Sequence, residues 1–221
     1  MGSDPFCSLV EFYPVENWWP SRSRFEVIVG AILVQNTRWS NVAAAIRELR
    51  RAGCLTPTVM RDCSPARLRR LIHSAGCQSI KARRLKAVAT FIDDSGGLNK
   101  LAKQPTETLR KALLKVHGIG PETADAMLGF AFKRRVFIAD QYARRWLWRM
   151  GLAPDEILHD YDGGRRLGEK LLQRSVIDRQ DVHAAIVLHG QAVCKRVPDC
   201  PRCFIRRQCK EGSKENQWCR T

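Results

Sequence analysis

The 221-residue sequence contains no run of about 18 apolar residues, which excludes a membrane-spanning helix. Its first residues lack a basic stretch followed by an apolar one, so we expect no secretory signal and a cytoplasmic, nucleoid-associated protein. No internal repeat, low-complexity tract or flexible linker is found either. We therefore do not expect two domains joined by a tether, and we expect a monomer.

Acidic residues are too few to balance the basic ones. The chain has 38 Lys and Arg against 22 Asp and Glu, which gives a formal net charge of +16. This excess favours a polyanionic partner, and nucleic acid is the first candidate. A membrane surface is a poorer candidate, because the basic residues are spread over many predicted helices and are not gathered on one amphipathic segment.

Alternating strand-like runs bounded by hairpin turns are also missing, so the sequence predicts an all-α fold. Residues 25–33 are nearly all apolar and are interpreted as a helix, because helical spacing resumes after a break at residues 35–37. Ser64 and Pro65 form a helix start signal, with Ser as the N-cap. Further helices are predicted at residues 80–92, 141–150, 167–172 and 182–193.

The stretch from residue 113 to 140 carries the strongest local pattern. Apolar residues recur at helical spacing on both sides of a His-Gly-Ile-Gly turn, and Pro121 suits the first position of the second helix. We therefore predict two helices joined by a tight hairpin. Glycines let a ligand approach the main chain, and helix N-terminal N–H groups attract anions such as a DNA phosphate. An ordinary αα-hairpin with a glycine cap is the alternative.

Nine cysteines in a chain without export suggest metal ligation before disulfides. Cys194, Cys200, Cys203 and Cys209 are separated by five, two and five residues, and only the central pair has the spacing of a zinc knuckle. The wider outer gaps favour a [4Fe–4S] cluster, with zinc as the alternative. The remaining cysteines are interpreted as small apolar residues or incidental thiols: Cys7, Cys54, Cys63, Cys77 and Cys219.

Five segments together resemble the endonuclease III superfamily of DNA base-excision glycosylases. They are VQNT (34–37), VHGIGPETADAML (116–128), FIAD (137–140), HAAIVLHGQAVC (183–194) and the cysteine loop. The first cysteine gap departs from the family, which commonly has six residues there. The resemblance implies two helical lobes, residues 25–134 and residues 1–24 plus 135–221. Double-stranded DNA with a damaged base would bind between them, and the C-terminal cysteines would hold the iron–sulfur cluster.

Asp140 is the residue that the resemblance singles out for catalysis. Cleavage of the bond between base and sugar builds positive charge at C1′, so the site needs a fixed carboxylate near that carbon. An alternative interpretation is that Asp140 caps the helix starting at Gln141. Both roles are compatible, because capping would hold the carboxylate in place.

Glu122 stands where family members that also cut the strand have a lysine. That lysine attacks C1′ and forms a Schiff base, and a carboxylate cannot do so. We therefore predict a monofunctional glycosylase. Glu122 could position water or favour a cationic base, or it could simply be an acidic residue in a first helical turn.

An aromatic group suggests the base pocket and the substrate. Trp18, Trp19, Pro20 and Trp39 would stack on a flipped base, although each tryptophan could instead belong to the core. With Glu122 and a tyrosine two positions after Asp140, this set most resembles the 3-methyladenine glycosylase branch. An alkylated purine is a cation and a good leaving group, so cation–π stacking would select it.

The resemblance also suggests residues that contact DNA. Gln35 would fill the gap left by the flipped base, or would be only a polar helix break. The full predicted set is Gln35, Asn36, His117, Gly118, Ile119, Gly120, Thr123 and Lys195. Alternative activities are an endonuclease III-like glycosylase with lyase activity, or a glycosylase for mismatched adenine, uracil or thymine, which would need a proton donor. A non-catalytic iron–sulfur protein that binds DNA lesions is an alternative of another class.

Overall fold

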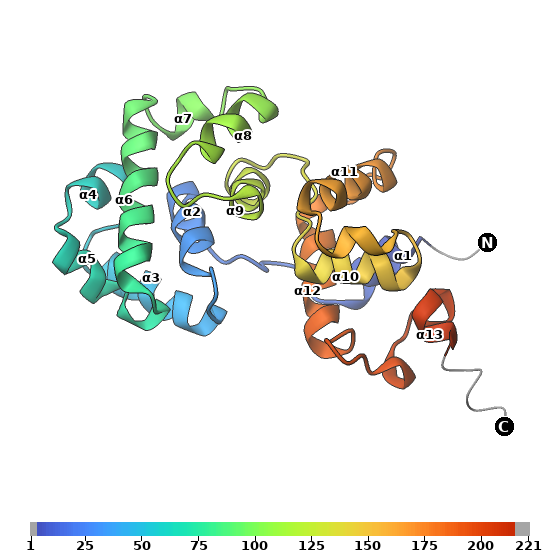
Figure 1. Ribbon diagram of the computed structural model, residues 1–221. Helices are drawn as coiled ribbons and strands as arrows, with labels where there is room; N and C mark the ends of the chain where they lie inside the picture. The colour runs from blue at the N-terminus through green and yellow to red at the C-terminus, as the bar shows by residue number, and fades with distance from the viewer. Residues whose placement is uncertain (1–3, 215–221) are drawn as a thin grey trace. The chain divides into compact units, whose positions relative to one another are not determined.

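The computed structural model describes residues 4–214, and these residues form helices without any β-strand (Figure 1). The all-α prediction is confirmed. The chain divides into two compact units, Trp19–Arg134 and Met1–Trp18 with Arg135–Thr221. The predicted lobes differ from these units only in the assignment of residues 19–24. Within the described part, no helix is long and apolar enough to cross a membrane.

The unit Trp19–Arg134 is built around α2 (Arg24–Leu33), which is buried along nearly its whole length. Helices on several sides contact α2, and this explains why its sequence is apolar all round (Figure 1). The other elements are α3 (Trp39–Arg51), α4 (Pro57–Asp62), α5 (Pro65–Leu71), a 3-10 helix (His73–Ala75), α6 (Gln78–Asp94), α7 (Leu98–Leu101), α8 (Thr106–Leu114), α9 (Pro121–Ala126) and a π-helical segment (Met127–Ala131).

Side chains close several helix ends in this unit. Ser64 accepts a hydrogen bond from the Arg67 N–H and Pro65 occupies the first turn, which confirms the predicted start of α5. Lys81 is buried, and its Nζ donates to the Leu33 carbonyl (2.9 Å) and to the Ala75 carbonyl (2.7 Å). The lysine thus provides a partner for a carbonyl at the C-terminal end of α2.

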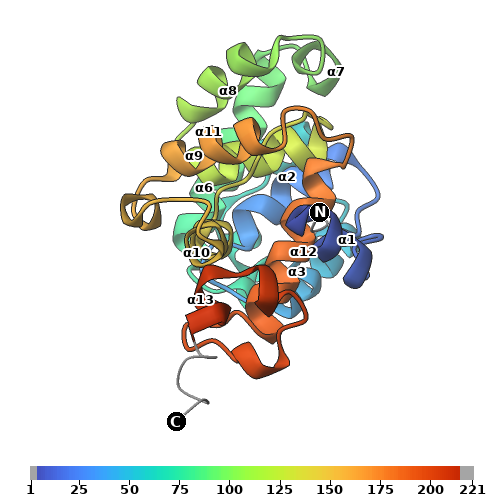
Figure 2. The ribbon, with the colours of Figure 1, turned by 90° about the vertical axis from the view of Figure 1, so that its right-hand side faces the viewer.

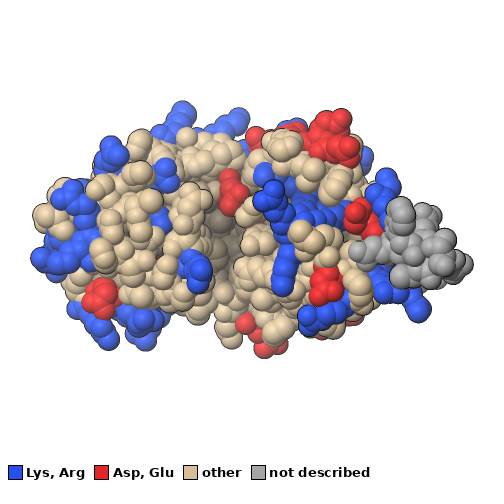
Figure 3. All heavy atoms as spheres, turned by 60° about the horizontal axis from the view of Figure 1, so that its bottom comes forward, with Lys and Arg blue, Asp and Glu red and all other residues tan. Residues whose placement is uncertain are grey.

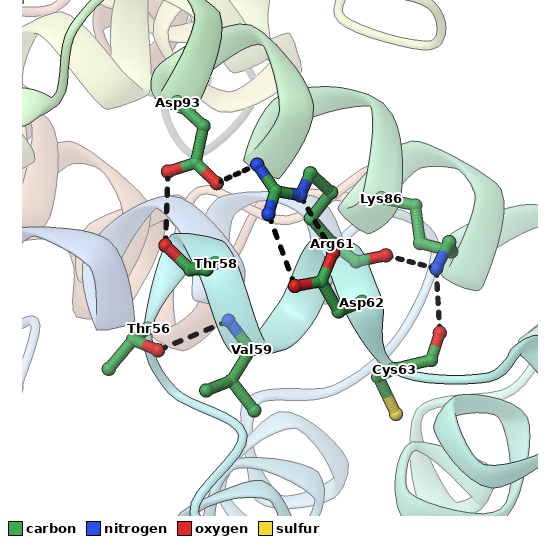
Figure 4. Close-up of polar contacts among 8 residues, drawn as sticks. All are labelled: Thr56, Thr58, Val59, Arg61, Asp62, Cys63, Lys86 and Asp93. Carbon is green, nitrogen blue, oxygen red and sulfur yellow. Dashed lines mark hydrogen bonds and ion pairs between the residues drawn. The ribbon is translucent and has the colours of Figure 1, made fainter.

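Polar contacts attach α4 to α6 (Figure 4). Lys86 of α6 donates to the backbone carbonyls of Arg61 and Cys63, where α4 ends. The Arg61 guanidinium pairs with Asp62 and reaches Asp93 of α6 at 2.9 Å. These contacts hold a short helix whose own backbone hydrogen bonds are few.

The second unit contains α1 (Pro5–Phe12), α10 (Gln141–Met150), a 3-10 helix (Asp155–Leu158), α11 (Tyr161–Leu171), α12 (Arg179–Ala192), two 3-10 turns (Cys200–Arg202 and Arg206–Gln208) and α13 (Lys210–Lys214). Its core includes Phe137, Leu147 and Ile186, and the Phe6 ring packs on Trp146 with centroids 5.0 Å apart. Figure 2 shows α13 and the loop after α12 from another side.

Several helices differ from the sequence-based expectation, and α4 was not predicted at all. No helix was predicted before residue 25, yet α1 begins at Pro5 after the capping side chain of Asp4 and packs on α12. The predicted helix 167–172 begins earlier, at Tyr161, because Asp160 caps it. Both α1 and α11 begin at a capping aspartate that lies before the apolar residues of the helical pattern.

The isolated cysteines vary in their surroundings. Cys54 and Cys63 are buried, as expected for small apolar residues, whereas Cys7 is half-buried and Cys77 is exposed. Burial raises the pKa of the Cys54 thiol. Cys219 lies outside the described residues.

Candidate functional site

The predicted helix–turn–helix is present as α8, the turn His117–Gly120 and α9. Gly118 has a positive φ of +81°, which only glycine adopts readily, and Pro121 lies in the first turn of α9 as predicted. Leu109, Leu113 and Val116 are buried before the turn, and Ala124, Met127 and Leu128 after it. One apolar face of the hairpin therefore packs into the unit.

A buried ion pair joins the two helices of the hairpin. Arg110 of α8 donates to both carboxylate oxygens of Asp125 in α9, with Nε at 2.8 Å and Nη2 at 3.1 Å. Asp125 is fully buried and Arg110 is 9% exposed. A bidentate pair fixes both distance and orientation. The contact therefore sets how the two helices meet at the turn.

Exposed and buried positions alternate along the turn. His117, Gly120 and Glu122 are exposed, whereas the Ile119 side chain is buried and its N–H donates to the Val116 carbonyl. The N–H groups of Gly118 and Gly120 donate to no acceptor within residues 4–214. These two N–H groups are therefore the main-chain donors that the turn can offer to an anion.

Gln35 and Asn36 lie in the loop that follows α2. The Nε2 of Gln35 donates to Thr123 Oγ1 (2.9 Å) and to the Gly118 carbonyl (3.5 Å), so its side chain is attached to the hairpin. Asn36 is exposed and has a left-handed backbone, with φ of +55°. The structure thus brings together three of the residues predicted to contact DNA: Gln35, Gly118 and Thr123.

Arg84 of α6 contacts the same group but was not predicted from the sequence. Its Nη1 donates to Gln35 Oε1. No motif around residue 84 marks it, because its partner lies 49 positions away in the sequence. Only the tertiary structure could identify this residue.

The aromatic residues predicted for the base pocket divide between the two units. Trp19 and Trp39 meet edge to face with centroids 5.3 Å apart, and Phe130, which was not predicted, lies 4.8 Å from Trp19. Trp18 packs partly buried against the core of the other unit. Pro20 is exposed. Trp19, Trp39 and Phe130 are therefore the aromatic group that the structure assembles within one unit.

Asp140 is the N-cap residue of α10. It is only 8% exposed, and its Oδ1 accepts a hydrogen bond from the Ala143 N–H at 2.8 Å. The capping role considered in the sequence is thus present. The positive end of the helix dipole stabilises a negative charge at this position. One oxygen of this carboxylate is used by the cap, which fixes the direction of the other.

His183 of α12 is a neighbour of Asp140 that the sequence analysis did not single out. Burial lowers the pKa of His183, while the charge of Asp140 and a hydrogen bond with the Ile138 backbone oppose that shift. The imidazole is therefore neutral near pH 7. The motif that begins at His183 was noticed, but a single histidine there carried no signal of its role.

The four clustered cysteines line one small cavity in their unit. Cys200 is buried and the other three are half-buried. Burial raises the pKa of the Cys203 and Cys209 thiols. Within the part of the chain that the structure describes, no three metal-binding side chains converge as an ion site. Four sulfur donors around one cavity are nevertheless the donor set that an iron–sulfur cluster requires.

Arginines of α10 hold the first part of the cysteine loop. The buried Arg149 donates to Cys194 Sγ (3.2 Å), the Lys195 carbonyl (2.6 Å) and the Arg196 carbonyl (2.8 Å). Arg145 donates twice to the Cys194 carbonyl, at 3.0 and 3.2 Å. The side chain of Lys195 is exposed. The loop is therefore attached to the same helix that Asp140 caps.

A histidine also lines this cavity. His189 Nδ1 lies 3.0 Å from the Tyr13 hydroxyl, and its Nε2 lies 3.8 Å from Cys203 Sγ. Burial lowers the pKa of His189 to about 4. A neutral ring that accepts from Tyr13 at Nδ1 presents its Nε2–H to the sulfur.

The helical fold and its helix–hairpin–helix agree with a family of base excision DNA repair proteins. Residues 29–174 match the HhH-GPD superfamily of base excision DNA repair proteins, and the chain belongs to this family.

Similar proteins agree with this assignment. A Methanocaldococcus jannaschii protein, whose name places it among DNA repair glycosylases, is 37% identical over 204 residues, covering 91% of this chain and 92% of that protein. Endonuclease III of Sulfolobus acidocaldarius is 31% identical and covers 86% of this chain and 83% of its own. The structure of the H. pylori 3-methyladenine DNA glycosylase bound to 1,N6-ethenoadenine superposes with a TM-score of 0.70 at 25% identity. The match covers 84% of this chain and 92% of that one.

Proposed function

We propose that this protein is a DNA glycosylase that hydrolyses the N-glycosidic bond of an alkylated purine and leaves the strand uncut. The observation that carries the proposal is the buried carboxylate of Asp140 at the N-terminus of α10. Breaking the bond leaves positive charge on the sugar, and a fixed negative charge beside C1′ stabilises that transition state. The hydrogen bond from Ala143 keeps the carboxylate in one orientation, so little reorganisation is needed during the reaction.

The residue at position 122 supports hydrolysis without strand cleavage. A covalent route needs an amine that can form a Schiff base with C1′, and Glu122 has none. Glu122 is exposed in the first turn of α9, where it could orient a water molecule or favour a cationic base. Neutral His183 is a second group beside Asp140 that could hold the attacking water by hydrogen bonding.

The aromatic residues favour a cationic base. Trp19, Trp39 and Phe130 form one aromatic group. Trp18 and Pro20 stay predicted contacts of the base. A positively charged alkylpurine gains from the face of an indole ring by about 0.5–2 kcal/mol. Such a base is also a good leaving group, so the site would need no strong general acid.

The hairpin is the proposed contact with the DNA backbone. The Gly118 and Gly120 N–H groups would bind a phosphate, with His117, Asn36 and the exposed Lys195 as further contacts. Gln35 would fill the gap that the extruded base leaves. Lys and Arg side chains spread over the visible surface agree with a polyanionic partner (Figure 3).

Cys194, Cys200, Cys203 and Cys209 would hold a [4Fe–4S] cluster, with zinc as the alternative. Bound there, the metal group would cross-link the C-terminal loop and hold Lys195 in place for DNA. The support is the shared cavity, together with the hydrogen bonds from Arg149 to the loop.

One assay tests the proposal. Purified protein is incubated with duplexes carrying methylated purines, uracil, thymine glycol or mismatches, and products are analysed with and without alkali. We expect release of the methylated purine and strand breaks only after alkali. Breaks without alkali, with an adduct trapped by borohydride, would instead establish a lyase. Release of uracil, thymine or adenine alone would assign the mismatch activity, and binding without release of any base would indicate a lesion-binding protein.

A further inference from the structure

Arg84 contacts the turn of the hairpin at its most constrained residue. Gly118 has a positive φ, and a Cβ atom added to it would lie 2.6 Å from both Cδ and Nε of Arg84. The arginine stem therefore occupies the space that the missing side chain leaves. The glycine serves two purposes, because it permits the turn and admits the arginine.

The same arginine fixes the amide of Gln35. Arginine only donates hydrogen bonds, so the amide atom that it contacts must be the oxygen. The other end of the amide then donates to Thr123 Oγ1 and to the Gly118 carbonyl. Gln35 is thus held at both ends, by α6 on one side and by the hairpin on the other.

No acidic side chain neutralises Arg84 in the described residues. No carboxylate lies within ion-pairing distance of its guanidinium, and its buried Nε has no hydrogen-bond partner there. The hydrogen bond to Gln35 is therefore the main polar interaction of the Arg84 side chain. This differs from Arg110, which is fully paired with Asp125 inside the same hairpin.

We infer that Arg84 is a positioning residue for Gln35, and that the two side chains and the Gly118 turn act as one unit when the protein fills a gap in the DNA stack. The inference rests on the proposed function, because it assumes that Gln35 enters this gap. A glutamine already held at both ends loses less conformational freedom on binding than a free one. Arg84 would thereby increase affinity for DNA that contains a gap and not for intact DNA.

A double-mutant cycle tests this inference without any catalytic step. Arg84→Met keeps the stem that packs on Gly118 and removes the donors, and Arg83→Met is the matched control, because Arg83 is the exposed neighbour on the same helix. Kd is measured at one salt concentration for duplexes with and without a tetrahydrofuran abasic-site analogue. Gln35→Ala and the Arg84→Met/Gln35→Ala double variant complete the cycle.

We expect Arg84→Met to weaken binding to the abasic-site duplex by about 10-fold, the loss of one hydrogen bond to a charged group. In the Gln35→Ala background the same change should cost less than about 2-fold. Arg84→Lys, which keeps a charged donor, should restore most of the affinity. On intact duplex, Arg84→Met and Arg83→Met should lose affinity equally.

Two results would overturn the inference. One is an equal effect of Arg84→Met with and without Gln35, since the arginine would then act directly on DNA. The other is an effect on the abasic-site duplex no larger than that of Arg83→Met. Melting curves of all variants test whether they are folded. If Arg84→Met does not fold, Arg84→Lys is used in its place. The base-release assay on wild-type protein is separate, so loss of the proposed activity and loss of this coupling are distinguishable.

Discussion

The buried pair between Arg110 and Asp125 should make the hairpin the most sensitive part of its unit to a single substitution. Asp125→Leu removes a fully buried carboxylate and leaves the Arg110 guanidinium, 9% exposed, without its bidentate partner. Breaking a buried pair by removing one partner costs about 3–5 kcal/mol, because the remaining charge loses its bidentate partner in a low-dielectric interior. For a chain of this length, that corresponds to a fall in melting temperature of about 6–20 °C.

The double variant Arg110→Met/Asp125→Leu separates charge from packing. It removes both charges and keeps apolar side chains of similar length, so we expect it to regain most of the lost stability. Arg51→Met is the surface control. Its partner is Glu48 and the two side chains are 74% and 50% exposed, so screening by solvent should leave stability nearly unchanged.

Calorimetry and urea unfolding of the four proteins measure these differences, and binding to duplex DNA reports on the hairpin itself. Asp125→Leu should weaken DNA binding as well, because the ion pair sets how α8 and α9 meet at the turn. The reasoning would be refuted if Asp125→Leu cost less than about 1 kcal/mol. A double variant less stable than Asp125→Leu would refute it too, since the pair would then be important for its shape and not for its charges.

Four other variants test separate parts of the site. Asp140→Asn keeps an N-cap acceptor, so the protein should fold normally while base release from methylated-purine duplex falls by at least about 100-fold; an unchanged rate would contradict the catalytic role. Glu122→Lys should produce a borohydride-trapped adduct that the wild type lacks, and its absence would mean that position 122 does not reach the sugar. Lys81→Met leaves the Leu33 and Ala75 carbonyls without this donor, so urea unfolding should show a loss of about 2–4 kcal/mol; a loss near zero would mean that water replaces it. Cys203→Ser should lower the iron content measured by elemental analysis and the visible absorbance of the purified protein, whereas a colourless wild type with bound zinc would overturn the cluster assignment.

Short-range signals in the sequence were sufficient to predict much of the fold. The apolar run of α2, the Ser64–Pro65 start of α5 and the glycine turn of the hairpin are all determined by neighbours within a few residues. The cap at Asp140 could also be foreseen, because an aspartate before a helical pattern is a short-range signal. In each case the backbone hydrogen bonds and the side chain that satisfies them lie close together in the sequence.

The helical class, the hairpin and the residue types available for chemistry could all be predicted from short-range patterns in the sequence. Which of these residues meet depends on the tertiary structure, because the contacts join positions far apart in the chain. The tertiary structure placed Arg84 on Gln35 and Phe130 beside Trp19, gathered the four cysteines around a cavity held by Arg149, and assigned Trp18 and Trp19 to different units. Packing of distant segments depends on shape and burial over the whole unit, which spacing along the sequence does not encode.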